Sequence, residues 1–396
     1  MKIRFDHLTF LAVLGLFAAS CNEPFDYNYY SEDDYAKIAE KLNLPNAPVI
    51  YRLELPQHLR NAGLSTLPVD GPKATLGRVL FYDKSLSADG TVSCASCHKQ
   101  QIAFADDRAV SVGVNGQNGT RNSIALGSVL AFTAYYGTDL FGASAVPFFW
   151  DNRAGTARQQ NMASLTNPVE MGLHDAQIAE IVKSKPYYPP LFRAAYGDDG
   201  PITTQRVSEA IAEFINAMGS FNSKLDKAVE ATASASGGFV DWESQSLNYV
   251  GLNAQENQGR RIFSQHCASC HTTIQSRPML LHANNGLDAQ TTDAGVGGLS
   301  GKSSEIGSFK VPLLRNIALT APYMHDGRFK TLEEVVEFYN SGIQPHPNLH
   351  QRLKQGNQPK RLNLSQSDKA ALVAFLHTMT DPAFVSDPRY SDPFKY

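Results

Sequence analysis

The chain of 396 residues has little cysteine, little tryptophan and no long hydrophobic run. Four of its five cysteines fall in two short motifs, so no pair is left from which a disulfide could form. Beyond the N-terminal segment, no apolar stretch approaches the roughly 20 residues that a transmembrane helix needs. The net charge is −3 and no basic block stands out, which argues against nucleic-acid binding. The composition is that of a globular chain long enough for two domains.

One pentapeptide, Cys-Ala-Ser-Cys-His, occurs twice, at residues 94–98 and 267–271. C-x-x-C-H is the attachment pattern of a c-type haem, in which both cysteines bond to the porphyrin and the histidine binds the iron. The sequence therefore predicts two covalently bound haem c groups. The attachment residues are Cys94, Cys97, Cys267 and Cys270, and the proximal iron ligands are His98 and His271.

The N-terminus has the pattern of an export signal. Two basic residues precede the apolar run at residues 8–17, and small residues lead to Cys21. We interpret residues 1–21 as a lipoprotein signal peptide, with Cys21 as the lipid-modified first residue of the mature chain. The alternative is an ordinary cleaved signal that leaves a free thiol, which is a liability in an oxidising compartment. We expect a protein of the periplasm or cell envelope, held at a membrane by its lipid anchor.

Helical signals dominate the rest of the chain, and strand-like alternation is scarce. Capping patterns begin at Ser31, Asn253, Thr331 and Ser365 (or Ser367 in place of Ser365), and an apolar stripe runs through residues 203–229. We expect a mainly α fold with two cytochrome c-like helical domains, each carrying one covalently bound c-type haem. The predicted segments are a tether and N-terminal extension at 22–50, domain 1 at 51–235, a linker at 232–242, domain 2 at 245–385 and, within domain 2, a long glycine-rich loop at 284–308.

Two haems in one chain allow two classes of function. An electron-transfer protein closes both irons with two protein ligands, whereas an enzyme keeps one iron position open for a small molecule. After His98 the next histidine is His174, so the loop that follows the first motif offers no second histidine ligand. The candidate ligands left near the first haem are Met162, Met171, His174 and carboxylates, although core packing is the commoner role of a methionine.

Several further segments, in order along the chain, resemble the bacterial di-haem cytochrome c peroxidases and, among them, the MauG-type branch. The matching segments lie at residues 76–83, 86–98, 149–154, 167–172, 312–316 and 320–329. The resemblance implies an enzyme that reduces H2O2 to water at the N-terminal haem. Electrons would come from a small donor protein, such as a cytochrome c or a cupredoxin, and pass through the C-terminal haem. Members of the family often dimerise, so a homodimer is one expected assembly.

The resemblance also implies roles for single residues. Glu170 matches a distal acid that moves a proton between the two oxygens of peroxide, and Gln160 matches a hydrogen-bond partner of bound peroxide. Trp150 matches a tryptophan that relays electrons between the haems. Without the resemblance, Glu170 would be interpreted as a surface acid and Trp150 as a core residue. An inter-haem Ca2+ ion would be held by oxygens of Asn122, Thr320 and Pro322.

The chain departs from other family members at both irons. The loop at residues 111–117 has no histidine where they place one, which predicts a first iron open to peroxide without prior reduction. Fourteen residues beyond His325, where they place methionine, this chain has Tyr339. We expect Tyr339 to be the second ligand of the C-terminal iron, with Met324 as the alternative; a phenolate would lower the haem potential. The rival functions are a MauG-like enzyme that uses peroxide to oxidise a protein, and a non-enzymatic electron-transfer protein.

Overall fold

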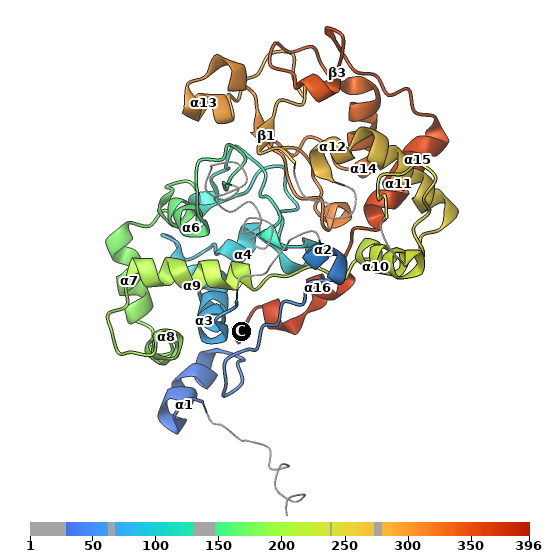
Figure 1. The fold of residues 1–396 in the computed structure, drawn as a ribbon. Coiled ribbons are helices and arrows are strands. Elements are labelled where there is room, and N and C mark those ends of the chain that lie inside the picture. Colours follow the sequence, from blue (N-terminus) through green and yellow to red (C-terminus); the bar gives the residue numbers. More distant parts are fainter. Residues whose placement is uncertain (1–28, 62–67, 130–146, 238–239, 273–278) are drawn as a thin grey trace, which may run out of the picture.

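The computed structural model describes residues 29–61, 68–129, 147–237, 240–272 and 279–396. The predicted signal peptide, including Cys21, lies outside these ranges. Helices dominate the described residues, which confirms the mainly helical prediction (Figure 1). Strands are confined there to two small antiparallel pairs, β1 (His282–Ala283) with β2 (Phe309–Lys310), and β3 (Lys354–Gln355) with β4 (Gln358–Pro359). No helix in the described part is long and apolar enough to span a membrane.

The first cluster of buried apolar residues is built mainly on α3, which packs against α8 and α9. Gly77 makes the α3–α9 crossing close, because a Cβ atom there would lie 1.8 Å from the Ala210 carbonyl oxygen. The helices that surround this cluster are α1 (Glu32–Lys41), α3 (Gly71–Tyr82), α6 (Ala157–Thr166), α7 (Asp175–Lys183), α8 (Tyr188–Tyr196) and α9 (Thr204–Asn216). The short helix α2 (Gln57–Asn61) packs instead against α10 (Lys224–Ser236).

The second cluster centres on the packing of α11 against α15. A glycine again makes the helix crossing close, since a Cβ atom at Gly259 would lie 1.9 Å from the Ala371 carbonyl oxygen. The helices that contribute to this cluster are α10 (Lys224–Ser236), α11 (Ala254–His266), α14 (Leu332–Glu337) and α15 (Gln366–His377), whereas α13 (Val296–Ser300) lies outside it. Each motif thus follows a helix, α3 or α11, that crosses its neighbour at a glycine.

The predicted helix starts are confirmed. Side chains of Ser31, Asn253, Thr331 and Ser365 each accept a hydrogen bond from a backbone N–H in the first turn of the following helix. Ser365 rather than Ser367 is the cap of α15. The 203–229 stripe is not continuous, because residues 217–223 separate α9 from α10. Residues 232–236 belong to α10, so the predicted linker is helical over its first part.

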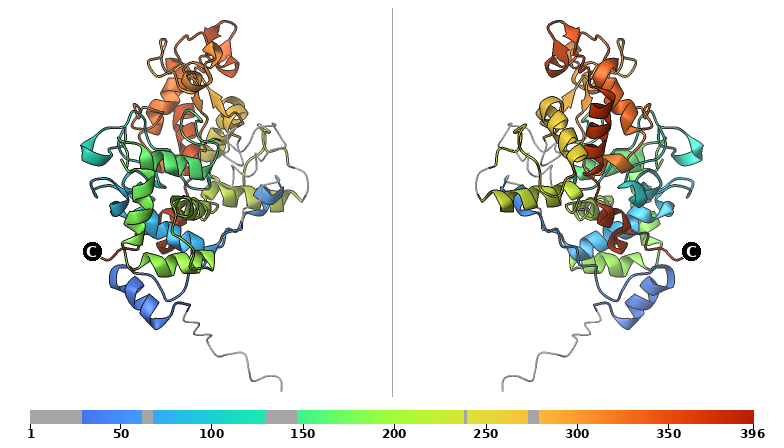
Figure 2. Two further views of the ribbon diagram at one scale, coloured as in Figure 1. Left: turned by 90° about the vertical axis from the view of Figure 1, so that its left-hand side faces the viewer. Right: turned by 90° about the vertical axis from the view of Figure 1, so that its right-hand side faces the viewer.

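The C-terminal segment returns to the first cluster instead of ending on the second. After α15, α16 (Pro382–Ser386) carries Phe384 into the first cluster, and Tyr390 follows it there. Figures 1 and 2 show this red segment beside α3. Conversely, α10 packs its apolar side on the second cluster. The predicted domain limits, 51–235 and 245–385, stay a prediction.

Outside these helices and strands, the described chain consists of the two motif helices, short helical turns and irregular segments. The glycine-rich stretch 284–308 is mostly irregular, as expected, but contains α13. The motif helices are α4 (Cys94–Cys97) and α12 (Ala268–His271). Single 3-10 turns occur at Lys84–Leu86, Gln100–Ile102, Val114–Gly116, Ser303–Glu305, Ile317–Leu319, Gln351–Leu353 and Pro388–Tyr390.

Candidate functional site

The first motif forms α4, a single helical turn, and His98 follows it directly. The ring Nδ1 of His98 lies 2.8 Å from the carbonyl oxygen of Phe104. When Nδ1 donates to that oxygen, Nε2 is the ring nitrogen left for a metal, the usual arrangement of a metal-binding histidine. Burial lowers the pKa of His98 and so favours the neutral imidazole that binds metals. The residues at this motif therefore fit a proximal haem ligand.

The structure brings Glu170 to the first motif. The turn after α6 holds its side chain, because Asn167 Nδ2 donates to Glu170 Oε1 over 2.8 Å. The backbone is fixed as well, since the Val114 N–H donates to the Glu170 carbonyl oxygen at 2.9 Å. Burial is the main reason why the pKa of the Cys94 thiol rises to about 12, and the nearby Glu170 carboxylate adds to this increase. A half-buried carboxylate thus lies within electrostatic reach of the attachment cysteine.

The other residues predicted near the first haem include Gln160, Met162 and Met171, and these contact α6 or the first cluster. Gln160 lies on α6, and its Nε2 donates to Ser164 Oγ over 3.1 Å, one turn further along the same helix. Met171 is buried in the first cluster and Met162 packs against it, so both have the core role that methionines commonly take.

At the second motif the structure has a cavity of about 260 Å³. Cys267, Cys270 and His271 line it together with both proposed second ligands, Tyr339 and Met324. The rest of its wall is largely apolar and includes Phe263, Leu314, Leu332, Val336, Leu372 and Leu376. Sulfur attachment points, an imidazole and an apolar wall are the features that a haem c group requires, so these residues fit it.

Tyr339 lies in a π-helical turn, Phe338–Gly342, that continues α14. Such turns are rare and occur frequently at functional sites. Burial raises the pKa of Tyr339 to about 12, opposed by a hydrogen bond from Asn285. Asn285 Nδ2 lies 3.4 Å from Tyr339 Oη and 3.6 Å from Met324 Sδ. Asn285 therefore contacts both of the atoms proposed as iron ligands. No motif or spacing in the sequence points to this residue.

His271 differs from His98 in its second ring nitrogen. Its Nδ1 is buried and has no partner in ordinary hydrogen-bond geometry among the described residues. Burial lowers the pKa of His271 to about 4, and the nearby Pro312 carbonyl only partly opposes this. Both proximal histidines thus have a backbone carbonyl near Nδ1, but only the contact of His98 with Phe104 has ordinary hydrogen-bond geometry.

Trp150 connects the two regions. Its Nε1 donates to the Asn122 carbonyl oxygen at 2.8 Å, and its own carbonyl accepts from the Lys310 N–H at 2.7 Å. Trp150 also lines the cavity at the second motif, although its chain segment leads into α6 of the first cluster. The role of Trp150 between the two haems stays a prediction.

The residues proposed for calcium are brought together in part. Asn122, Thr320 and Pro322 all line the second cavity, and the Asn122 N–H donates to the His325 carbonyl oxygen at 2.7 Å. The described residues contain no group of three or more His, Cys, Asp or Glu side chains that could hold a metal ion. A calcium ion at this place would depend on amide and carbonyl oxygens.

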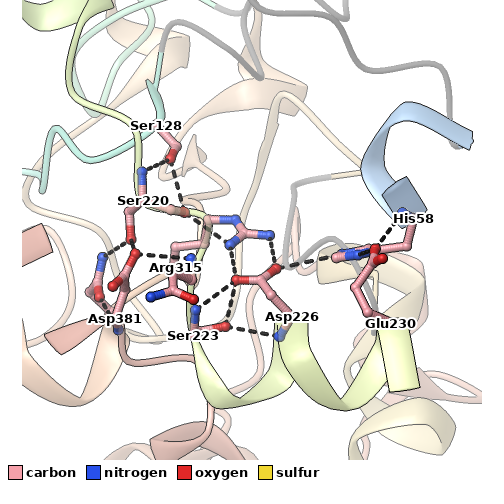
Figure 3. A network of polar contacts seen from close by, with 10 residues as sticks. His58, Ser128, Ser220, Ser223, Asp226, Glu230, Arg315 and Asp381 are labelled. Carbon is pink, nitrogen blue, oxygen red and sulfur yellow. Dashed lines mark hydrogen bonds and ion pairs between the residues drawn. The ribbon is translucent and has the colours of Figure 1, made fainter. Parts of the chain in front are cut away.

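A buried polar network that sequence reasoning missed lies behind the second cavity (Figure 3). Arg315, whose exposed side-chain fraction is 3%, makes two hydrogen bonds of 2.9 Å to the Asp226 carboxylate. His58 of α2 lies on the other side of Asp226, with its Nε2 3.5 Å from Oδ1, and its Nδ1 is 2.7 Å from Glu230. The network ties α2, α10 and the cavity wall together. Arg315 falls in the recognised segment 312–316, which is the one signal that could have drawn attention to it.

Comparison with known proteins gives consistent matches. Residues 71–234 match the family model for di-haem cytochrome c peroxidase. The methylamine utilization protein MauG of Methylorubrum extorquens is 30% identical over 325 residues, which cover 81% of this chain and 82% of that protein. The cytochrome c551 peroxidase of Nitrosomonas europaea is 29% identical over 79% of this chain and 81% of its own length.

A solved structure agrees with the sequence matches. The crystal structure of a MauG-like protein associated with microbial copper homeostasis superposes with a TM-score of 0.66. Its identity is 31%, and the match covers 87% of this chain and 98% of that one. Together with the motif geometry, these similarities show that the chain belongs to the di-haem cytochrome c peroxidase family and is an oxidoreductase of the cytochrome c peroxidase type.

Proposed function

We propose that this chain reduces hydrogen peroxide to water beside His98, with electrons that enter beside His271 and come from a small donor protein. Each turnover consumes H2O2, two electrons and two protons and yields two water molecules. When bound, the two haem groups supply the redox-active irons. The chain's own residues attach them, move the protons and connect the two sites.

The observation that carries the proposal is the position of Glu170. Its carboxylate is half-buried, fixed by Asn167 and close to Cys94. A carboxylate held there can accept a proton from the near oxygen of peroxide and return it to the departing oxygen. Gln160 would orient the substrate after its amide turns away from Ser164.

Trp150 would carry electrons from the second site to the first. The indole lines the second cavity, and Asn122 fixes its orientation through the Nε1 hydrogen bond. The same Asn122, with Thr320 and Pro322, would bind a Ca2+ ion that keeps the two regions in register. We further propose a periplasmic location, a lipid anchor at Cys21 and a homodimeric assembly.

Steady-state kinetics of the haem-loaded, full-length protein tests the function. With a reduced dye as electron donor, we expect peroxide consumption in proportion to dye oxidation, without any prior reduction of the protein. Electron paramagnetic resonance of the oxidised protein should then show one high-spin and one low-spin ferric signal. Two low-spin signals together with no turnover would contradict the proposal and favour a non-enzymatic electron-transfer protein.

Tyr339 favours a second candidate, a MauG-like enzyme that directs the oxidising power of peroxide at a protein. Its phenol lies in the cavity beside Asn285 and near the attachment cysteines. The test uses peroxide without dye and lysozyme as a tryptophan-rich probe protein, followed by mass spectrometry. Oxidised tryptophan that disappears in Tyr339→Phe, while dye-driven turnover remains, would support this candidate. Unmodified lysozyme would support the peroxidase alone.

A further inference from the structure

The surface around the second motif is basic, although the whole chain has a net charge of −3. Two stretches that form this region, residues 257–287 and 338–367, contain no aspartate and no glutamate. Their described surface cations are concentrated on and beside the β3–β4 hairpin. These cations are Arg352, Lys354, Lys360 and Arg361. We call them, together with the exposed side chain of Met279, the basic face.

Two cations of the basic face, Arg352 and Lys360, lie directly at the second motif. The Arg352 guanidinium donates to the carbonyl oxygen of Ser269, which stands between the two attachment cysteines. Burial is the main reason why the pKa of the His266 imidazole is lowered, and the positive charge of Lys360 lowers it further. Arg352 and Lys360 both line the second cavity, and Arg352 is exposed to solvent as well.

An exposed apolar side chain accompanies these charges. Met279 has 41% of its surface exposed, and its N–H donates to the Cys270 carbonyl oxygen at 2.7 Å. An apolar contact point with a charged, solvent-accessible surround is the usual anatomy of a protein interface. A methionine adapts its shape to a partner more readily than other apolar residues.

The first motif lacks this excess of positive charge. There Lys99 pairs with Asp106 and Asp107, and Arg108 pairs with Asp106. Among the residues that the structure describes, no carboxylate forms an ion pair with any of the four cations of the basic face. Their field is therefore not cancelled locally and reaches into solvent over about a Debye length, roughly 8–10 Å at physiological salt.

The basic face lies at the end of the molecule opposite α1, where a soluble partner can reach it. In Figures 1 and 2 the β3–β4 end of the molecule lies opposite α1, near which the described chain begins at residue 29. A lipid anchor at Cys21 would hold the α1 end toward the membrane. The basic face would then be directed away from it.

We propose that the basic face is the docking surface for an acidic electron-donor protein, a small redox protein whose cofactor edge is surrounded by Asp and Glu side chains. The proposal rests on the proposed function for the direction of electron flow, while the charge complementarity is a property of the surface itself. Attraction between opposite patches raises the association rate more than it raises affinity, and salt reduces it. The same field slows the association of a basic donor.

The test is the rate at which the donor reduces the haem-loaded, full-length protein, followed by stopped-flow absorbance. The probes are a reduced acidic cupredoxin and a reduced basic cytochrome c. With the acidic probe, we expect the second-order rate constant to fall at least about tenfold between low salt and roughly 0.5 M salt. The basic probe should react more slowly at low salt and should gain speed as salt is added.

The main variant is the double substitution Lys354→Gln and Arg361→Gln, because neither residue lines the cavity. It should slow the acidic probe about tenfold at low salt and weaken the salt dependence. The matched control is Lys37→Gln with Lys41→Gln on α1, which removes the same charge from two exposed positions, 50% and 59% accessible. The control should react as the unmodified protein does.

Arg352→Gln provides a second test and should slow the reaction with the acidic probe as well. Because Arg352 lines the cavity, only the rate of reduction by the donor is compared for this variant. A rate that depends neither on salt nor on the two variants, or an equal slowing by the α1 control, would overturn the proposal. Dye-driven peroxide turnover of the unmodified protein reports on the proposed function separately. Its absence would refute the peroxidase without affecting the docking result.

Discussion

The two haem-attachment regions have the same pentapeptide and the same helical support but different surroundings. Each motif follows a helix that crosses its neighbour at a glycine, Gly77 in α3 or Gly259 in α11. At the first, His98 makes a 2.8 Å contact with the Phe104 carbonyl and a carboxylate is nearby. At the second, Nδ1 of His271 faces the Pro312 carbonyl outside ordinary hydrogen-bond geometry, and Tyr339 lines the cavity. The motif fixes the attachment, and residues far away in sequence determine the chemistry.

The substitution with the largest expected effect is at Glu170, beside the first motif, and its effect is on peroxide turnover. Glu170→Gln keeps the shape and the hydrogen bonding of the side chain but cannot carry the proton, so peroxide turnover should fall about 10²–10⁴-fold. Haem content and reduction by dye should be unchanged, because both depend on other residues. Glu180→Gln, at an exposed position of α7, is the matched control. Turnover within twofold of the unmodified enzyme would remove Glu170 from the mechanism.

The buried ion pair between Arg315 and Asp226 should affect stability more than chemistry. Arg315→Leu leaves the Asp226 carboxylate buried without its main partner and should lower the free energy of unfolding by about 3–5 kcal/mol. Urea denaturation followed by circular dichroism measures this. Lys183→Leu, which breaks an exposed pair with Glu180 on α7, should cost only about 0–1 kcal/mol. Equal effects would mean that the buried network has no special role.

The same pair predicts a pH dependence. Burial alone would raise the pKa of Asp226, but Arg315, together with His58 and Ser223, outweighs burial and holds the pKa well below its usual range. Because the folded pKa lies below the unfolded value of about 3.9, this stabilisation is complete well above pH 4 and is lost as the pH falls through and below that value. Asp226→Asn should flatten the acid limb of the stability curve. An unchanged acid limb would contradict the assignment.

Smaller effects are expected from substitutions of Tyr339 and Met324, the two candidate ligands of the second iron. These effects should be confined to the second haem. Tyr339→Phe removes the phenolate, so the low-spin ferric signal should change and the potential of the second haem should rise. Met324→Leu should leave both unchanged if Tyr339 is the ligand. If Met324→Leu changes the signal and the potential while Tyr339→Phe leaves both unchanged, Met324 is the second ligand of that iron. Potentiometry with electron paramagnetic resonance at each step distinguishes the two outcomes.

Local features of both regions could be predicted from sequence. The caps at Asn253, Thr331 and Ser365 depend on side chains three residues away, and the attachment motifs are contiguous in sequence. The break between α9 and α10 could not be predicted, because the apolar stripe continues across it and tertiary packing decides where the helix ends. The return of Tyr390 to the first cluster is likewise a long-range contact.

The candidate site could be proposed from the sequence only where family segments mark it. Glu170, Trp150 and Tyr339 could be selected by resemblance, although their partners could not. The Phe104 carbonyl that orients His98 is a backbone group and leaves no trace in a side-chain pattern. Asn285 lies in an irregular glycine-rich stretch, 54 residues before the phenol that it contacts. Such partners become visible only when the chain is folded.

The smallest expected effect is at Asn285, which distinguishes the second region most finely from the first. A hydrogen bond to a phenolate stabilises its charge by roughly 1.5–3 kcal/mol and weakens its donation to iron. Asn285→Leu should therefore lower the potential of the second haem by less than Tyr339→Phe raises it. In the Tyr339→Phe background the same substitution should have no such effect, because its partner is gone. A shift of equal size in both backgrounds would mean that Asn285 acts through the cavity wall or through Met324 and not through the phenol.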